Sequence, residues 1–209
     1  IKTTKVEGHN GYVNLDKSFV SKYKYFVAEG LSLYTWYLPK FAGLDPETGE
    51  SLFYKDIIDG EGNVTGQETT KDASQATDYL IGDALPSFYG GLGTSLSFYG
   101  FDFSINLNYQ LGGKAYDYTY QTLMHSSGTT ATTWHTDILK AWSPENTNTN
   151  IPRLRFAETY SQNPRSDRFI TNASYLNIQN INLGYTLPAS ITQKYNIQNI
   201  RVYFSGENM

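Results

Sequence analysis

Hydrophobic and polar residues alternate without exception over the eleven residues 101–111. The apolar positions are Phe101, Phe103, Ile105, Leu107, Tyr109 and Leu111, and a polar residue stands between each pair. Because successive side chains of a β-strand point to opposite faces, this segment is predicted to be a strand with one apolar and one polar face. Its length matches the roughly 9–11 residues with which a tilted strand crosses a bilayer. Strands of soluble sandwiches also alternate but usually have only about 5–6 residues, so the length favours a membrane strand.

Similar patterns predict further strands around this one. Residues 92–98 alternate between apolar and small residues, and the Tyr99-Gly100 pair then predicts a tight hairpin turn into the strand 101–111. A third long strand is predicted over 174–187, with a β-bulge at Gln179-Asn180 because the apolar parity shifts there. A short helical or turn connector over 188–196 leads to a last strand at 198–205.

The first part of the chain predicts shorter elements. Pro sets φ and Gly permits positive φ, so the Gly-Leu-Asp-Pro-Glu-Thr-Gly run at 43–49 predicts a turn. Strands are expected at 1–6, 23–28, 31–37 and 51–56, a second tight turn at 57–66, and one short helix at 71–78.

Residues 112–170 form a long polar segment rich in Thr, Asn and Ser. A loop of about 60 residues is unusual in a compact soluble domain. Membrane barrels have short turns on one side and long loops on the other. We therefore expect the 99–100 turn and the 188–197 connector on one side, with the loops 39–86 and 112–170 on the opposite side.

Composition excludes several classes of protein. The chain has 209 residues, 18 Tyr, 11 Phe and no Cys, and only 17% of its residues are charged, below the usual quarter. No apolar run approaches the roughly 20 residues of a membrane helix. The absence of Cys excludes disulfides and thiolate metal sites, and a net charge of -4 gives no reason to expect nucleic-acid binding. The chain starts at Ile1 and stops after a strand-like run, so it is expected to be a piece of a longer polypeptide.

A set of short segments, ordered along residues 25–209, carries a family resemblance. They are Phe41–Gly49, Leu85–Leu92, Phe101–Lys114, Ala141–Asn146 with Ile151–Arg153, Ser166–Phe169, Ala173–Leu176, Leu183–Pro188, and Arg201–Tyr203 with Gly206–Asn208. Together they resemble motifs of the SusC/RagA family of TonB-linked (TonB-dependent) outer-membrane proteins. One such motif is a weak signal, but this many in the family's order form a strong one.

The resemblance implies an all-β fold. Residues 1–209 would be part of the C-terminal portion of a 22-stranded transmembrane antiparallel β-barrel with long extracellular loops, and the plug, early strands and final strands would lie outside this chain. It further implies import of glycans or peptides across the outer membrane of a Gram-negative, Bacteroidetes-like cell. The implied partners are a SusD-like surface lipoprotein, outer-membrane lipid and the TonB complex, which would act through the missing N-terminal part. The piece alone would not transport.

Aromatic residues in or beside the long polar segment are candidates for substrate contact. Trp134, Tyr116 and Tyr118 are the candidates, because aromatic faces stack on sugar rings and Tyr hydroxyls satisfy polar ligands. Alternatively, they are interfacial girdle residues or pack within the loop. Trp142, inside a Trp-Ser-Pro-Glu-Asn run, is interpreted as a packing residue.

Polar residues of the alternating strand are candidates for the barrel interior. Asp102, Asn106, Asn108 and Gln110 are predicted to face the lumen, because membrane barrels turn apolar residues toward lipid. There they would contact the plug or line hydrated space, and the sequence leaves both open.

The sequence offers little evidence for a metal or cofactor. Its histidines are His9, His125 and His135, which have no zinc-binding spacing and are interpreted as solvated residues. Calcium binding by Asp45, Glu47 and Glu50 is an alternative, but the 43–49 turn explains these residues more simply. No metal, cofactor or catalytic residue is therefore predicted.

The glycine-rich run 90–93 does not continue into a nucleotide-binding motif. Its glycines are interpreted as letting the chain bend or leaving room for neighbouring side chains. No Gly-x-Ser-x-Gly motif supports an enzyme. The alternative to the importer hypothesis is a soluble β-sandwich that binds carbohydrate on an aromatic strip.

Overall fold

The structure is a computed structural model that describes residues 3–13, 25–124, 133–155 and 163–209. Its contacts divide the chain into two compact units. The first combines residues 1–85 and 114–171, and the second combines residues 86–113 and 172–209. None of the helices among the described residues is long and apolar enough to cross a membrane.

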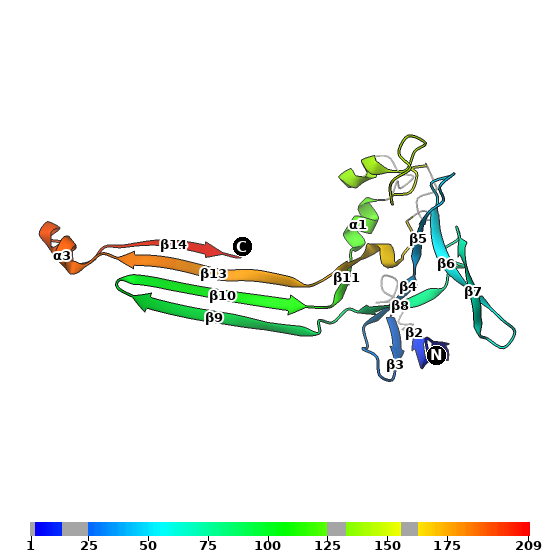
Figure 1. Cartoon of the computed structure of the whole chain (residues 1–209), viewed down its shortest axis with the longest axis horizontal. Coiled ribbons are helices and arrows are strands. Elements are labelled where there is room, and N and C mark those ends of the chain that lie inside the picture. Colours follow the sequence, from blue (N-terminus) through cyan, green and yellow to red (C-terminus); the bar gives the residue numbers. More distant parts are fainter. Residues whose placement is uncertain (1–2, 14–24, 125–132, 156–162) are drawn as a thin grey trace. The chain divides into compact units, whose positions relative to one another are not determined.

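The second unit is a four-stranded antiparallel sheet in the order β14-β13-β10-β9 (Figure 1). Its strands are β9 (Phe88–Phe98), β10 (Phe101–Leu111), β13 (Tyr175–Thr186) and β14 (Arg201–Glu207). The strand predicted at 101–111 is confirmed with the same limits. The predicted hairpin turn is also confirmed: Tyr99 and Gly100 adopt φ values of 48° and 85°, the left-handed conformation that two-residue hairpins use.

The predicted bulge in the third long strand is present. Asn106 pairs with Asn180 while Leu107 pairs with Ile178, so Gln179 is left without a partner in the ladder. Because of this extra residue, the apolar side chains before and after the bulge lie on the same face of the sheet. The predicted connector is formed by α3 (Ala189–Thr192) and the 3₁₀ turn η3 (Gln193–Tyr195).

The first unit contains shorter strands. A five-stranded sheet has the order β1-β2-β3-β4-β8, a three-stranded sheet the order β5-β6-β7, and β11 pairs with β12. The bounds are β1 (Thr3–Val6), β2 (His9–Val13), β3 (Tyr25–Ala28), β4 (Thr35–Pro39), β5 (Phe41–Leu44), β6 (Ser51–Ile58), β7 (Val64–Thr70), β8 (Asp78–Asp83), β11 (Lys114–Tyr116) and β12 (Ile170–Asn172). As in the second unit, no sheet among the described residues closes on itself.

The sequence-based expectations for this unit need correction. The helix predicted at 71–78 is wrong: Asp72 Oδ1 accepts a hydrogen bond from Ser74 N at 2.9 Å, and the chain turns into β8 at Asp78. Short polar side chains that bond to nearby backbone compete with helix formation in this way. The strand β2 was not predicted, because Asn10 and Gly11 interrupt its pattern.

The long segment 112–170 carries short elements of its own. They are β11, α1 (Tyr118–Leu123) and the 3₁₀ turns η1 (Thr136–Lys140) and η2 (Asp167–Phe169), followed by β12. Asp117 caps α1 by accepting a hydrogen bond from Tyr120 N at 2.7 Å, which satisfies a free N–H of the first turn.

The core of the first unit is aromatic. Tyr25, Trp36 and Leu38 are buried together, and partly buried Tyr116 and Ile170 pack against them. The Trp36 indole N–H donates to the Lys114 carbonyl at 2.8 Å. This contact joins the first strands of the chain to the segment that follows β10.

Candidate functional site

Apolar side chains from all four long strands share one face of the sheet in the second unit. Residues paired across antiparallel strands lie on the same face, so Leu107 shares its face with Leu92 and Ile178. The same register adds Phe88, Leu96, Phe98, Phe101, Phe103, Ile105, Tyr109, Leu111, Leu176, Ile181, Leu183, Tyr185, Val202 and Phe204. Leu92 is 66% exposed, Leu176 69% and Phe204 62%. A contiguous exposed apolar face marks contact with a membrane or another protein.

Polar side chains gather on the opposite face. The register places the predicted lumen-facing residues Asp102, Asn106, Asn108 and Gln110 there together, with Ser95, Ser97, Ser104, Asn177, Asn180 and Asn182. Asn182 Nδ2 donates to Asn180 Oδ1 at 2.6 Å, and Gln110 Nε2 donates to the Ala173 carbonyl at 3.1 Å. That this face lines a lumen stays a prediction.

Glycines make room on the polar face. Asn106 Oδ1 lies over Gly93, in the space that a Cβ would take, which confirms the interpretation of this glycine. Asp102 and Arg201 form an ion pair across Gly184, with Nε and Oδ1 3.0 Å apart. A Cβ at Gly184 would stand 2.6 Å from both the Asp102 carboxylate and Arg201 Nη2, so a larger residue there would displace the ends of these two side chains.

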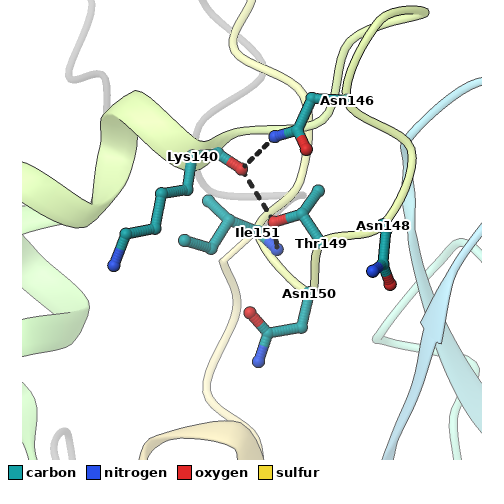
Figure 2. Close-up of a pocket in the computed structure, with 6 residues that line it drawn as sticks. All are labelled: Lys140, Asn146, Asn148, Thr149, Asn150 and Ile151. Atoms are coloured by element: carbon teal, nitrogen blue, oxygen red, sulfur yellow. Dashed lines mark hydrogen bonds between the residues drawn. The ribbon is translucent and has the colours of Figure 1, made fainter.

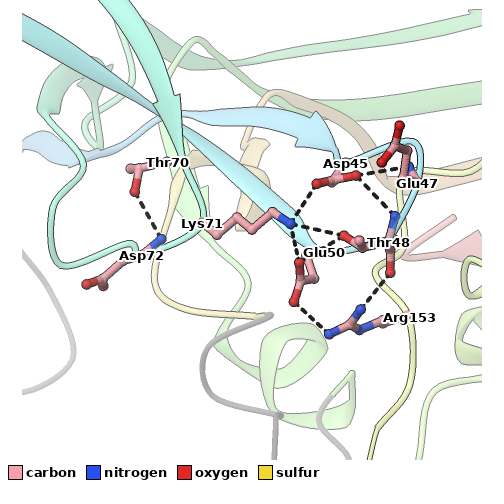
Figure 3. Close-up of polar contacts among 8 residues, drawn as sticks. All are labelled: Asp45, Glu47, Thr48, Glu50, Thr70, Lys71, Asp72 and Arg153. Carbon is pink, nitrogen blue, oxygen red and sulfur yellow. Dashed lines mark hydrogen bonds and ion pairs between the residues drawn. The ribbon is translucent and has the colours of Figure 1, made fainter.

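A charged cluster in the first unit joins three distant segments (Figure 3). Lys71 Nζ lies 2.7 Å from Asp45 Oδ2, and it also bonds to Glu50 and to Thr48 Oγ1. Arg153 Nη2 lies 2.6 Å from Glu50 Oε1, and its Nη1 donates to the Thr48 carbonyl at 3.0 Å. We call these five residues the loop clamp.

The loop clamp explains the acidic residues that the sequence offered as calcium ligands. The Lys71 ammonium stands between the Asp45 and Glu50 carboxylates, and the Glu47 side chain points away from it (Figure 3). Among the described residues, no group of three or more His, Asp or Glu side chains is arranged to hold a metal ion.

Trp142 packs against the same turn. Its indole covers Gly49, in the space of a Cβ, and Gly49 has a φ of 68°. Arg153 N donates to the Gly49 carbonyl and Trp142 N to the Ile151 carbonyl, both at 2.9 Å. The interpretation of Trp142 as a packing residue is confirmed, because the Trp-Ser-Pro-Glu-Asn segment lies on the Asp-Pro-Glu-Thr-Gly turn.

The loop clamp is charged at neutral pH. The hydrogen bond from Lys71 lowers the pKa of Asp45 to about 2, and bonds from Lys71 and Thr48 lower the pKa of Glu50. A carboxyl group whose folded-state pKa is lowered stabilises the fold above its unfolded pKa and loses this effect as the pH falls through the folded value. The clamp therefore keeps its full effect at neutral pH. It weakens only as the pH falls below about 4, the ordinary carboxyl pKa, toward the Asp45 pKa of about 2.

We expect Glu50→Gln to loosen the segment 141–153. Glu50 is the carboxylate that bonds to both Lys71 and Arg153, so its neutralisation weakens both charge-assisted contacts. Trypsin should then cut the full-length protein after Arg153 several-fold faster, as measured by mass spectrometry of the fragments. Glu47→Gln is the matched control, and equal cleavage in both variants would contradict a clamp.

The three predicted substrate residues lie in different settings. Tyr116 packs in the aromatic core, 5.9 Å from the Trp36 ring and 6.1 Å from the Phe169 ring, and its hydroxyl donates to Gln121 Oε1 at 2.7 Å. Burial raises its pKa. Tyr118 and Trp134 are exposed by 43% and 44%. The contact of all three residues with substrate stays a prediction. No local signal in the sequence could have separated the partly buried Tyr116 from the two exposed residues.

The histidines also differ in setting. His135 Nδ1 accepts a hydrogen bond from Asp137 N at 3.1 Å and thereby caps η1, which the sequence did not indicate. His9 lies in β2, and His125 lies outside the described residues.

No family profile matches the chain. TonB-dependent receptor P3 of Formosa agariphila is 32% identical over 165 residues, which are 79% of this chain and 15% of that receptor. TonB-dependent receptor P26 of the same organism is 24% identical over 130 residues, or 62% of this chain and 13% of that receptor. The chain thus spans less than a sixth of the length of these curated relatives.

Solved structures of RagAB share the fold. The open-open state of the RagAB peptide importer aligns with 99% of this chain and 21% of its own chain, at a TM-score of 0.65 and 23% identity. The closed-closed state aligns with 89% of this chain and 22% of its own chain, at a TM-score of 0.63 and 24% identity. The chain matches part of a SusC/RagA-type TonB-dependent receptor. The resemblance read from the motifs is confirmed, and the mostly antiparallel sheets, none of which closes on itself among the described residues, fit the expected partial barrel.

Proposed function

We propose that the receptor containing this chain imports glycans or peptides across the outer membrane, driven through TonB and assisted by a SusD-like surface lipoprotein. The observation that carries the proposal is the four-stranded sheet of the second unit. Three of its strands have 11 or 12 residues, which is enough to cross a bilayer. One face of the sheet is apolar and exposed, and the other face is polar. A soluble sandwich would bury such a face against a second sheet.

The proposed partners follow from the family. The RagAB structures are those of a peptide importer, and this supports an import role for the receptor segment described here. The TonB complex would engage the part of the receptor that precedes this chain. Residues 1–209 would then belong to the C-terminal barrel portion of that receptor.

The proposed mechanism is gated passage without covalent chemistry. Asp102, Asn106, Asn108 and Gln110 would line hydrated space or contact the plug. Trp134 and Tyr118, whose rings are exposed, would offer stacking surfaces to the cargo on the outer side. Tyr116, the last residue of β11, would support that region from the aromatic core.

Uptake by cells that carry the full-length receptor tests the proposal. Fluorescent oligosaccharides and hexapeptides would be supplied to the wild type, to a receptor deletion, and to cells lacking TonB or treated with a proton uncoupler. We expect the wild type, but not the receptor deletion, to take up either the oligosaccharides or the hexapeptides. This uptake should stop in cells that lack TonB and in cells treated with the uncoupler. Uptake that continues without TonB would contradict the proposal.

A topology prediction follows from the connections of the sheet. The hairpin turn at Gly100 ends β9 and β10 on one side, and the long loops leave the same strands at the opposite end. An epitope tag at Gly62, an exposed residue in the turn after β6, should bind antibody on intact cells. A tag at Gly100 should bind only after the outer membrane is opened, and the reverse result would show an inverted barrel.

A further inference from the structure

A polar hollow of about 650 Å³ opens beside the end of η1 (Figure 2). Its lining consists of Lys140, Asn146, Asn148, Thr149, Asn150 and Ile151. The volume lies within the range of about 300–1,000 Å³ that is typical of small-molecule sites. The six residues lie between the last residue of η1, Lys140, and the clamp residue Arg153.

The hollow is held in shape by hydrogen bonds between its own side chains and backbone. The Lys140 carbonyl accepts hydrogen bonds from Asn146 Nδ2 at 3.1 Å and from Thr149 Oγ1 at 2.7 Å (Figure 2). Thr149 Oγ1 in turn accepts from Ile151 N at 3.2 Å. Arg153 of the loop clamp anchors the chain two residues beyond the lining. A ligand would therefore meet a largely preorganised site, which reduces the entropy lost on binding.

The hollow presents free, uncharged hydrogen-bonding groups. Asn148 and Asn150 are exposed, and neither side chain bonds to any residue in the described ranges; no dashed line reaches them in Figure 2. The Lys140 ammonium is paired with Asp137 Oδ1 at 2.6 Å. Each carboxamide offers two donors and one acceptor oxygen, a set that matches neighbouring sugar hydroxyls.

We propose that this hollow binds a neutral saccharide unit of the imported cargo, an inference that rests on the proposed import function. Peptides are bound through open strand edges or through apolar pockets for their side chains. The lining contains one aliphatic residue, Ile151, which is only 5% exposed, and its single cation is already paired. The chemistry therefore favours a hydroxyl-rich, uncharged ligand over a peptide.

Binding to the purified full-length receptor tests this inference. The probes are neutral gluco-, manno-, galacto- and xylo-hexaoses, and mixed-sequence hexapeptides, each titrated by calorimetry. Asn148→Ala/Asn150→Ala should weaken the affinity for at least one hexaose tenfold or more. Thr147→Ala is the control, because this exposed neighbour in the same loop lies outside the lining and should bind like the wild type. Unchanged tryptic patterns confirm that both variants fold.

The outcomes separate this inference from the import proposal. An unchanged hexaose affinity in the double variant, with hexaose uptake intact in cells, would overturn the saccharide site and leave import standing. Binding and uptake of hexapeptides alone would overturn the saccharide class and still leave import standing. If the wild-type receptor supported TonB-dependent uptake of neither hexaoses nor hexapeptides, both the import proposal and the saccharide site would be overturned.

Discussion

Replacing Leu107 with Arg in the full-length receptor is expected to destabilise the barrel by about 2–4 kcal/mol, the cost of a cation on the lipid face near the bilayer midplane. Leu107 stands in the middle of β10 and is paired with Leu92 on one side and Ile178 on the other. The apolar face therefore continues across three strands at this level. Urea titration in detergent or lipid, followed by the heat-modifiable migration of the folded barrel, measures the loss.

Asn106→Arg is the matched control for this prediction. Asn106 is the preceding residue of the same strand, lies on the polar face and is exposed. A long cation there can extend into water, so we expect little change in the urea midpoint. Equal losses in both variants would show that the two faces of the sheet do not differ in their surroundings.

Trp36→Ala should destabilise the first unit by about 3–5 kcal/mol, as truncation of a buried aromatic residue does. Trp36 is 3% exposed, its ring centroid lies 4.6 Å from that of Tyr25, and its indole N–H donates to the Lys114 carbonyl. The substitution removes packing and leaves the partly buried Lys114 carbonyl without this donor. Denaturant unfolding of the full-length receptor, followed by tryptophan fluorescence and by proteolysis, gives the measurement.

Tyr118→Ala controls for the loss of an aromatic residue as such. Tyr118 is 43% exposed at the start of α1, so its removal should change the free energy of unfolding by no more than about 0.5 kcal/mol. If Tyr118→Ala proved as costly as Trp36→Ala, the aromatic core would not be organised around Trp36.

The sequence by itself determined those features that depend on local chain geometry. The period-two alternation of β10, the left-handed pair Tyr99-Gly100 and the parity shift at Gln179 each act over a few residues. They could be read directly, because strand facing and turn conformation follow from side-chain spacing and backbone sterics. The order of the family motifs also needed only the sequence.

Only the tertiary structure decided which distant residues meet. Lys71 bonds to Glu50 across 21 positions and Arg153 bonds to Glu50 across 103, and the local pattern around Lys71 had indicated a helix instead. The same holds for Gly184 beneath the Asp102–Arg201 pair and for Tyr116 inside the aromatic core. Ion pairs and packing contacts depend on where whole strands lie in space, and residue spacing along one strand carries no record of a partner 100 positions away.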